Sequence, residues 1–312
     1  MGEFDLIERY FKRPTRRAVL GVGDDCALLQ PTAGMQLAVS SDMLVEGRHF
    51  FPDVDPDALG HKALAVNLSD LAACGATPLA FTLALALPRV DETWLAGFSA
   101  GLLALADTHG CELVGGDTTQ GPLNICITVF GEVPRGQALL RSGAQVGDDI
   151  YVSGALGDAR LALEALLGKL QLPTDELARA RTRLERPEPR VALGQALRGI
   201  ASSAIDISDG LVGDLGHILQ ASGVGASLDT NAALELMAAD GKKLEYVLAG
   251  GDDYELAFTA APSTRQAVAA AAAQSGTAVT RIGKIQQQPG LELVDGRGQP
   301  VPGNFRSFDH FA

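Results

Sequence analysis

Short apolar runs and amphipathic stretches alternate along the chain, and this pattern predicts a fold that mixes strands and helices. Segments 80–87 and 125–133 are short and mostly apolar, as expected of buried strands. Segment 37–42 indicates a strand that ends in polar residues. Further strands are expected near 149–153, 203–207, 255–260 and 278–284, and a final hairpin at 291–301 that turns around Asp295 and Gly296.

Start and stop signals place helices between these strands. Asp55 is an expected N-cap before Pro56 at the first helical position, and this helix should run to about Gly75. Asp91 is expected to cap a second long helix, which Gly110 closes. Four more helices are expected near 157–168, 189–200, 209–222 and 263–275. Together these elements predict an α/β or α+β architecture.

The length of 312 residues suggests two domains, because it exceeds what one ordinary core needs. Segment 134–149 is polar and contains glycine, so we place the boundary there, between an N-terminal domain at 1–138 and a C-terminal domain at 139–312. The motifs NLSDL (67–71) and DISDGL (206–211) both place Ser-Asp at an expected element junction. A repeated motif of this kind is expected if the two halves of the chain are related.

The acidic balance of the chain restricts its partners. The net charge is −13, the pI is about 4.8, and no basic stripe is present. This composition argues against nucleic acid and against an anionic membrane surface. If the substrate is a phosphate, cations other than Lys and Arg must neutralise it.

Cysteine spacing and the N-terminal sequence favour a reducing cytoplasm. None of the four cysteines lies in a C-x-x-C pair, so neither a zinc site nor a redox motif is indicated. The start, MGEFDLIERYFKR, has early acidic residues and no long apolar segment, unlike a signal peptide. Apolar runs such as 79–87 are too short to span a bilayer.

Six acidic motifs carry the candidate chemistry, and several directly follow an apolar segment, where a strand or helix should end. In open α/β folds, ligands bind at such positions. Any one motif could equally be a turn or a helix cap. Because there are six, a shared ligand is the stronger hypothesis. The motifs are GVGDDCA (21–27), SSD (40–42), NLSD (67–70), GGDTT (115–119), DISDG (206–210) and GGDDYEL (250–256).

Asp70 is the sharpest single case. It shares one helical face with Leu59, Ala63 and Val66, so its carboxylate should point inward. A buried carboxylate without a partner is strongly unfavourable. A divalent cation is one possible partner, and backbone N–H groups are the alternative.

The donor types select the metal. Aspartates with Ser and Thr hydroxyls, without clustered His or Cys, favour Mg²⁺, Mn²⁺ or Ca²⁺ over zinc, and the spacing of an EF-hand is absent. Several Mg²⁺ ions bridging a polyphosphate would also join an acidic protein to an acidic nucleotide. A Walker A motif and the protein-kinase motifs are both missing.

Read in order, the motifs resemble the thiamine-monophosphate kinase family of the PurM-like ATP-binding superfamily. The aspartate motifs are shared by the superfamily, whereas EGRHF and the terminal FDHF point to this family. The resemblance spans nearly the whole chain. It is carried by GEFDLIERYF (2–11), GVGDDCALL, SSDMLVEGRHF, HKALAVNLSDLAACGA, GGDTTQGPL, the Arg-Ser-Gly-Ala at 141–144, AIDISDGLVGDLGHI, GGDDYEL and FDHF (308–311).

This resemblance implies ATP-dependent conversion of thiamine monophosphate to thiamine diphosphate, with a PurM-like fold of two domains and a homodimer paired through N-terminal mixed sheets. The implied metal-site residues are Asp25, Ser40, Ser41, Asp42, Asp70, Asp117, Asp206 and Asp209. The implied nucleotide contacts are Gly116, Asp117, Arg141 and Ser208, and those to thiamine phosphate are His49, Asp252 and Phe308. Asp42, Asp117 and Arg141 are the expected catalytic residues.

Two positions depart from the family pattern. The family usually has Glu where this chain has Asp252, so the shorter acid has less reach. Phe308 often corresponds to Tyr or Trp, so an aromatic face is kept but a polar contact is lost. Without the resemblance, His49 could be a surface residue, Arg141 could be solvated in a linker, and Phe308 could belong to the core.

The expected reaction is direct in-line phosphoryl transfer. The acceptor is a phosphate monoester whose second pKa is about 6, so it is already a nucleophile at neutral pH and needs no general base. Three alternatives remain open: another PurM-like enzyme of purine or hydrogenase-maturation chemistry, a metal-dependent phosphohydrolase, and a nucleotide-binding subunit without activity.

Overall fold

The computed structural model describes residues 2–239, 242–303 and 305–308, and its contacts divide into two compact units. Unit 1 comprises Met1–Leu71 and Ala76–Gly136, and unit 2 comprises Ala72–Gly75 and Gln137–Ala312. Each unit has its own sheet. The sequence-based division at 138/139 stays a prediction.

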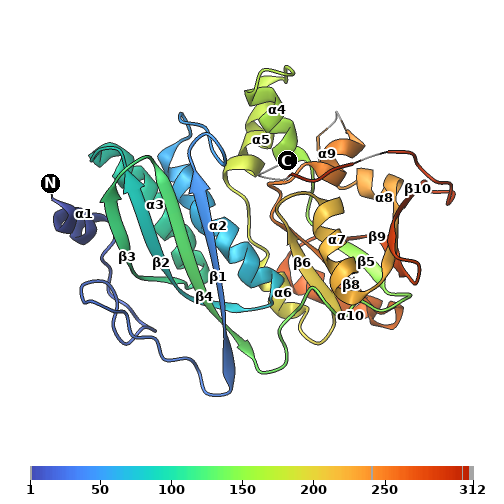
Figure 1. The fold of residues 1–312 in the computed structure, drawn as a ribbon, viewed down its shortest axis with the longest axis horizontal. Helices are drawn as coiled ribbons and strands as arrows, with labels where there is room; N and C mark the ends of the chain where they lie inside the picture. The colour runs from blue at the N-terminus through green and yellow to red at the C-terminus, as the bar shows by residue number, and fades with distance from the viewer. Residues whose placement is uncertain (1, 240–241, 304, 309–312) are drawn as a thin grey trace. The chain divides into compact units, whose positions relative to one another are not determined.

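Unit 1 is built on a mixed four-stranded sheet (Figure 1). Its strands follow the order β1-β4-β2-β3, in which β4 is antiparallel to β1 and β2, and β3 is parallel to β2. The sheet therefore has β1 at one edge and β3 at the other. Its elements are α1 (Glu3–Tyr10), β1 (Met35–Val45), α2 (Pro56–Ala73), β2 (Thr77–Leu87), α3 (Glu92–His109), β3 (Glu112–Gln120) and β4 (Asn124–Pro134).

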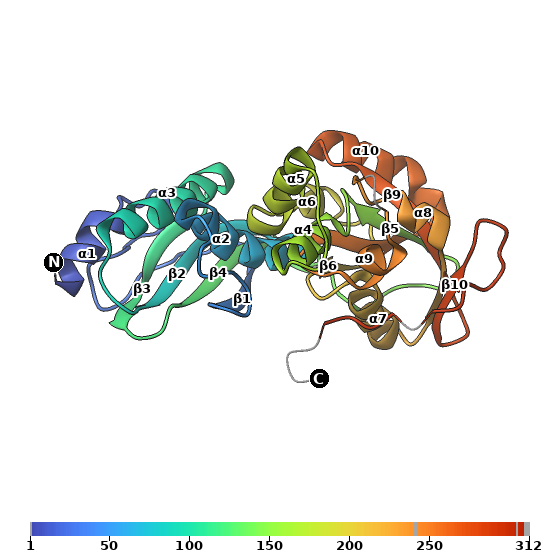
Figure 2. The same ribbon diagram turned by 90° about the horizontal axis from the view of Figure 1, so that it is seen from above.

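Helices α2 and α3 cover one face of this sheet (Figure 2). Alternate residues of β4, Ile125, Ile127 and Val129, are almost fully buried, as expected where one face packs on helices. The two helices approach closely because glycine lies at their contact: a Cβ on Gly101 would be 1.9 Å from the carbonyl oxygen of Asp57. Among the described residues of unit 1, no helix covers the other face of the sheet.

The caps predicted for α2 and α3 are confirmed. Asp55 Oδ1 accepts the backbone N–H groups of Asp57 and Ala58, at 2.9 and 3.1 Å. Asp91 accepts those of Thr93 and Trp94 in the same way. Gly110 ends α3 in the left-handed conformation, with φ of 60°.

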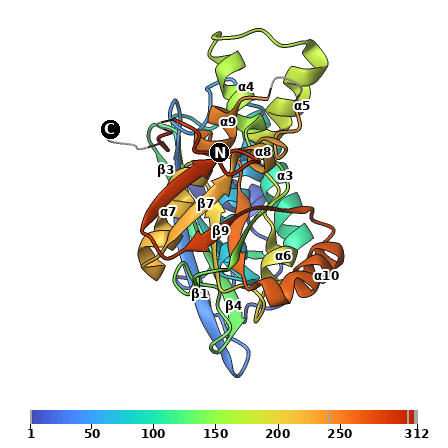
Figure 3. The ribbon, with the colours of Figure 1, turned by 90° about the vertical axis from the view of Figure 1, so that its right-hand side faces the viewer.

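Unit 2 is built on a six-stranded sheet in the order β10-β7-β9-β5-β8-β6. Helix α7 lies on one side of it, with α6 and α10 on the other (Figures 2 and 3). Its elements are β5 (Asp149–Ser153), α4 (Asp158–Leu166), α5 (Thr174–Glu185), α6 (Val191–Ala196), β6 (Ser203–Ile207), α7 (Leu211–Ser222), β7 (Gly225–Asp229), α8 (Thr230–Leu234), α9 (Leu244–Ala249), β8 (Glu255–Ala260), η1 (Pro262–Thr264), α10 (Arg265–Ser275), β9 (Val279–Gln286) and β10 (Gly290–Val294).

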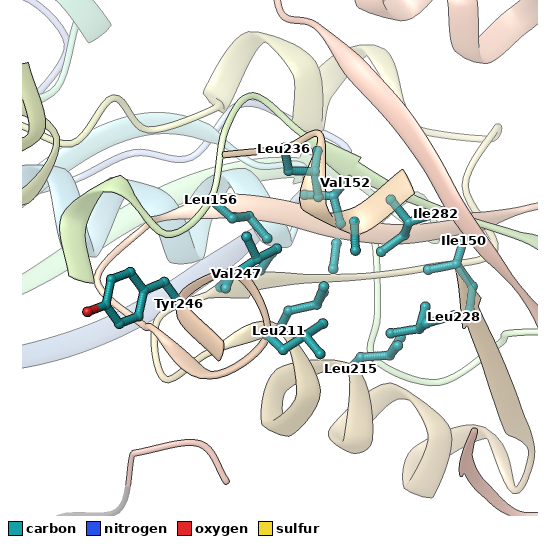
Figure 4. Close-up of a cluster of buried hydrophobic side chains, with 14 of the residues drawn as sticks. Ile150, Val152, Leu156, Leu211, Leu215, Leu228, Leu236, Tyr246, Val247 and Ile282 are labelled. Atoms are coloured by element: carbon teal, nitrogen blue, oxygen red, sulfur yellow. The ribbon is translucent and has the colours of Figure 1, made fainter. Parts of the chain in front are cut away.

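The core of unit 2 lies between α7 and the sheet (Figure 4). Leu211 and Leu215 are one turn apart on α7 and fully buried. They face Ile150 of β5 and Leu228 of β7 in the same cluster. This packing fixes the start of α7, which follows directly after the DISDG motif.

Most of the predicted elements are confirmed, including β5, β6 and β8 with the predicted bounds. Three expectations were wrong in part. The strand at 37–42 does not end at the polar residues, because β1 continues to Val45. GGDTT does not lie where a strand or helix ends but is part of strand β3, which was not predicted. The terminal hairpin is reduced to a bridge between Val294 and Pro300, while β10 pairs mainly with β7.

Among the residues that the structure describes, no helix is both long enough and apolar enough to cross a bilayer.

Candidate active site

Ser40 and Asp70 meet at the β1 edge of unit 1. Asp70 lies within α2 rather than at an element junction, which corrects the expected place of NLSD. Its half-buried carboxylate turns toward the sheet, as predicted, and Ser40 Oγ of β1 donates to Asp70 Oδ2 at 2.5 Å. Two of the predicted metal-site residues, 30 positions apart, are therefore neighbours.

Asn67 fixes the third member of this group, a role that the sequence reading missed. Its Oδ1 accepts the backbone N–H of Asp42 at 3.1 Å, and its Nδ2 donates to the carbonyl oxygen of Ala63 at 3.0 Å. Asn67 precedes Asp70 by three residues, so both lie on one side of α2. The three-residue spacing in the sequence could have indicated this role. A buried amide on the same helical face as a candidate ligand is well placed to orient its neighbours. We define Ser40, Asp42 and Asp70 as the β1-edge group.

Ser41 does not belong to this group. Successive side chains of a strand point to opposite faces, and Ser41 points to the face without helices. There its Oγ donates to the carbonyl oxygen of Ile127 at 3.1 Å and lies 3.0 Å from Thr128 Oγ1. The structure therefore separates Ser41 from Asp70.

A groove runs along the other edge of the same sheet, between α1, the 22–27 loop and β3. Its volume is about 820 Å³, and its lining includes Asp25, Gly116 and Asp117. Both aspartates are exposed. We define these three residues as the β3-edge group. The structure thus brings together residues that the sequence separates by more than 90 positions.

A β-bulge sets the position of Gly116. Phe81 pairs with Leu113 but Thr82 pairs with Gly115, so Val114 is an extra residue in β3, opposite no residue of β2. Gly116 then has φ of 144°, and a Cβ there would be 1.9 Å from the carbonyl oxygen of Leu83. Only glycine fits, and the backbone at Gly116 stays open to the groove.

The two groups of unit 1 are distinct within one chain. Asp117 is in register with Ala84 of β2, Cys126 of β4 and Met43 of β1, so three strand spacings separate the edges. At about 4.8 Å per spacing, this is roughly 14 Å. Unit 1 therefore divides its predicted ligands into two groups instead of gathering them around one point.

In unit 2, three backbone hydrogen bonds assemble the predicted residues. The N–H of Asp252 donates to the carbonyl oxygen of Ser208 at 2.8 Å, and that of Tyr254 donates to Ile207 at the same distance. The N–H of Phe308 donates to the carbonyl oxygen of Asp209 at 3.1 Å. DISDG, GGDDYEL and the C-terminal segment thus meet at the end of β6, with Asp206 buried in that strand. We call this the β6-end group.

Asp214, in the first turn of α7, holds the DISDG loop, and the sequence reading missed it. Its Oδ2 accepts the N–H groups of Ser208, Asp209 and Gly210, each at 3.1 Å. Burial, together with the charge of Asp209, raises the pKa of Asp214 to about 7. The sequence could have indicated this role, because Asp214 follows the candidate ligand Asp209 by five residues and lies in the first turn of a predicted helix.

The conformation of the GGDDYEL loop explains why Asp252 is an aspartate where the family usually has glutamate. Asp252 has φ of 59° and Tyr254 has φ of 51°. Asp tolerates this left-handed region better than Glu, because its short side chain can bond locally. Tyr254 Oη is 3.5 Å from Asp252 Oδ1. Between them, Asp253 is buried and accepts the N–H of Gly157 at 2.9 Å, which anchors the loop to the start of α4.

The remaining predicted residues occupy separate positions. His49 is half-buried, and its Nδ1 accepts the N–H of Val45 at 2.9 Å, so it is fixed at the end of β1. Arg141 is exposed at the start of unit 2, where the carbonyl oxygen of Leu140 accepts the N–H of Ala204. Phe308 is 48% exposed, so the alternative that it packs in the core is wrong.

The donors at these positions suit Mg²⁺. In the described part of the chain, no three His, Cys, Asp or Glu side chains are close enough together to hold an ion unaided. Mg²⁺ commonly takes only one or two carboxylates and completes its shell with water and phosphate oxygens. The carboxylate and hydroxyl oxygens of the β1-edge group match that preference.

Two protein-family models match the chain. The model described as AIR synthase related protein, N-terminal domain, matches residues 23–133. The corresponding C-terminal domain model matches residues 145–296. Each of the acidic motifs falls wholly or almost wholly within one of these two matches.

Full-length relatives are also similar. Thiamine-monophosphate kinase of Salmonella typhimurium is 48% identical over 321 residues, covering 100% of this chain and 98% of the relative. The crystal structure of thiamine-monophosphate kinase from Stenotrophomonas maltophilia has a TM-score of 0.84 at 45% identity and 96% coverage of each chain. A structure of AaThiL complexed with AMPPCP and TMP has a TM-score of 0.78 at 31% identity, covering 90% of this chain and 89% of that one.

Proposed function

We propose that the aspartates of this chain hold several Mg²⁺ ions for a direct in-line phosphoryl transfer. The premise is that the chain belongs to the thiamine-monophosphate kinase family and phosphorylates thiamine monophosphate with ATP. The family and the activity rest on identity across the whole chain and on a related structure with an ATP analogue and TMP. The observation that carries the metal proposal is the pairing of Ser40 with Asp70 beside Asp42.

When bound, Mg²⁺ would neutralise the phosphates and favour charge transfer to the leaving oxygen. On the side of the protein, we assign the β1-edge group and Asp25, Asp117, Asp206 and Asp209 as its candidate ligands. Ser41 could bind an ion only from the opposite face of the sheet, because its hydroxyl points there. The separation of the two edges of unit 1 supports more than one ion.

We assign the nucleotide contacts to Gly116, Asp117, Ser208 and Arg141. Gly116 offers open backbone at a bulge, which suits close approach of a phosphate. Ser208 stands in a loop whose three successive N–H groups are already held by Asp214, so its geometry is set before ligand binds. Arg141 would supply a positive charge from an exposed position.

We assign thiamine phosphate to His49, Asp252 and Phe308. The exposed ring of Phe308 can stack on a heterocycle, and Asp252 can attract the positive thiazolium. The phosphate of this substrate is already anionic at neutral pH, so the residues have to orient it rather than deprotonate it. No covalent intermediate on the protein is needed.

A homodimer is the proposed assembly, paired through the sheet face of unit 1 that lacks helices. On β1 this face presents Leu37, Val39 and Met43, which are 45%, 58% and 53% exposed. A row of exposed apolar residues on a sheet face is unfavourable in water, and a second copy of the same face would bury it. We also propose that the enzyme is cytoplasmic.

Incubation with ATP, Mg²⁺ and thiamine monophosphate tests the proposal. Formation of thiamine diphosphate and ADP in equal amounts would support it. In a second reaction with γ-labelled ATP, no label should remain on the protein after quenching. Free phosphate in place of thiamine diphosphate would favour a phosphohydrolase. Nucleotide binding without turnover would favour a non-catalytic subunit, and a labelled protein intermediate would rule out direct transfer.

A further inference from the structure

Phe4 is the most exposed of the large hydrophobic side chains in the described residues, at 83%. It lies on α1, whose opposite side buries Leu6. Exposing a whole phenyl ring to water is unfavourable, and an exposed aromatic residue is informative where it lines a cavity. Phe4 lines the same groove as the β3-edge group.

Helix α1 holds Phe4 in a defined place. Arg9 Nη1 contacts Glu92 Oε2 at 2.8 Å, and Tyr10 Oη donates to the carbonyl oxygen of Glu92 at 3.3 Å. Phe11, just after the helix, is buried. These contacts tie the helix to α3, so the exposed ring belongs to a supported element and not to a free end.

The groove combines apolar and polar surfaces. Phe4 and Ile7 of helix α1 and the adjacent Phe11 are apolar, and β3 contributes Gly116 and Asp117. The lining near α1 also includes the charged residues Glu3, Glu8 and Lys12. A nucleotide likewise combines a flat apolar base and a charged phosphate chain. Its base can pack on an aromatic ring while its phosphates lie at a strand with open backbone.

We propose that Phe4 packs against the adenine base of ATP in this groove. The inference rests on the proposed function, because that assigns Gly116 and Asp117 to the nucleotide. Adenine is favoured over the thiamine rings because Gly116 and Asp117, assigned to the nucleotide, line this groove. His49, assigned to thiamine phosphate, follows β1 at the opposite edge of the sheet. Phe4 is thus a binding residue that contacts the base rather than the phosphates.

Binding of two probes separates base recognition from phosphate recognition. Calorimetry with Mg²⁺ would compare ADP with inorganic tripolyphosphate, which lacks a base. Phe4→Ala should weaken ADP binding about tenfold or more and leave tripolyphosphate binding unchanged, whereas Phe4→Tyr should retain ADP binding. Val90→Ala is the matched control, since Val90 is 49% exposed and outside the lining of the groove.

Unchanged ADP affinity in Phe4→Ala, or an equal loss for tripolyphosphate, would overturn the proposal. A change confined to dimer dissociation would also overturn it, since a second copy would then cover the ring. Phe4→Trp gives an independent readout: its emission, above that of the native Trp94, should change on adding ADP, and an unchanged signal at saturating ADP would contradict stacking. Because these are binding measurements, they stand even if wild-type protein fails to make thiamine diphosphate.

Discussion

Ser40 Oγ lies 2.5 Å from Asp70 Oδ2, which joins the middle of an edge strand to a helix packed beside it. The contact shows how a carboxylate on a mostly apolar helical face is accommodated. The Ser40 hydroxyl supplies one partner, and Asn67 of the same helix accepts the backbone N–H of Asp42 on β1. This is the arrangement from which the metal proposal begins.

Replacing Asp70 by Asn should raise the Mg²⁺ concentration needed for half-maximal turnover by about 10- to 100-fold, because a neutral amide is a poor ligand. The measurement is initial rate against free Mg²⁺ at saturating ATP. Asp53→Asn, at an exposed position before α2, is the control and should behave as wild type. Identical Mg²⁺ curves for Asp70→Asn and wild type would remove Asp70 from the ligand set.

Asp117→Asn should lower turnover and raise the Mg²⁺ requirement too, since Asp117 faces the groove at the other sheet edge. Because the two edges are roughly 14 Å apart, the effects of Asp70→Asn and Asp117→Asn on ion binding should be nearly additive in free energy. A double-mutant cycle measures this. Strong coupling between the two substitutions would contradict separate ions at the two edges.

The pH dependence of stability should report on Asp214. Its pKa is raised above the unfolded value, so the folded state binds the proton more tightly between about pH 4 and pH 7. The resulting stabilisation is present at low pH and is lost as pH rises through about 7. Urea unfolding in EDTA should therefore show wild type losing more stability than Asp214→Asn from pH 5 to pH 8. Parallel profiles would show that Asp214 does not titrate in this range.

The buried carboxylate of Glu255 predicts a large loss of stability when a partner is removed. Arg190 contacts it through Nε and Nη2, both at 2.6 Å, and Arg183 Nη2 contacts it at 2.7 Å. Arg190→Met should lower the free energy of unfolding by about 3 kcal/mol. The control is Arg179→Met, which breaks an exposed pair with Asp175 and should leave the free energy of unfolding nearly unchanged. Equal midpoints in urea would contradict this account of Glu255.

The apolar face of β1 predicts the oligomeric state. Val39→Asp places a charge in the proposed dimer interface and should shift the protein from dimer to monomer in light scattering after size exclusion. Val90→Asp, a similar change outside that face, should remain dimeric. If Val39→Asp stays a dimer at low concentration, the two copies must associate elsewhere.

Local signals were sufficient to predict much of the fold. Caps at Asp55 and Asp91 and the short apolar runs gave the helices and strands because these signals act within a few residues. Strand β3 was missed because its sequence, with two glycines followed by four polar residues, has weak strand propensity. Its pairing with β2 across a bulge comes from long-range packing, which periodicity does not report.

The candidate site was predictable in its members but not in its grouping. The sequence placed Ser40, Ser41 and Asp42 together, whereas the strand turns Ser41 to the other face. Asn67 and Asp214 were missed because their roles depend on backbone N–H groups elsewhere in the fold. Phe4 became a candidate only when its exposure and the groove were known.

The most direct test of the account is titration of the enzyme with Mn²⁺, in the presence of a non-hydrolysable ATP analogue, followed by the electron paramagnetic resonance signal of the free ion. Wild type should take up more than one Mn²⁺ per chain, and Asp70→Asn and Asp117→Asn should each lose part of that uptake. Uptake that is the same in wild type and both variants, or no more than the analogue binds by itself, would contradict it.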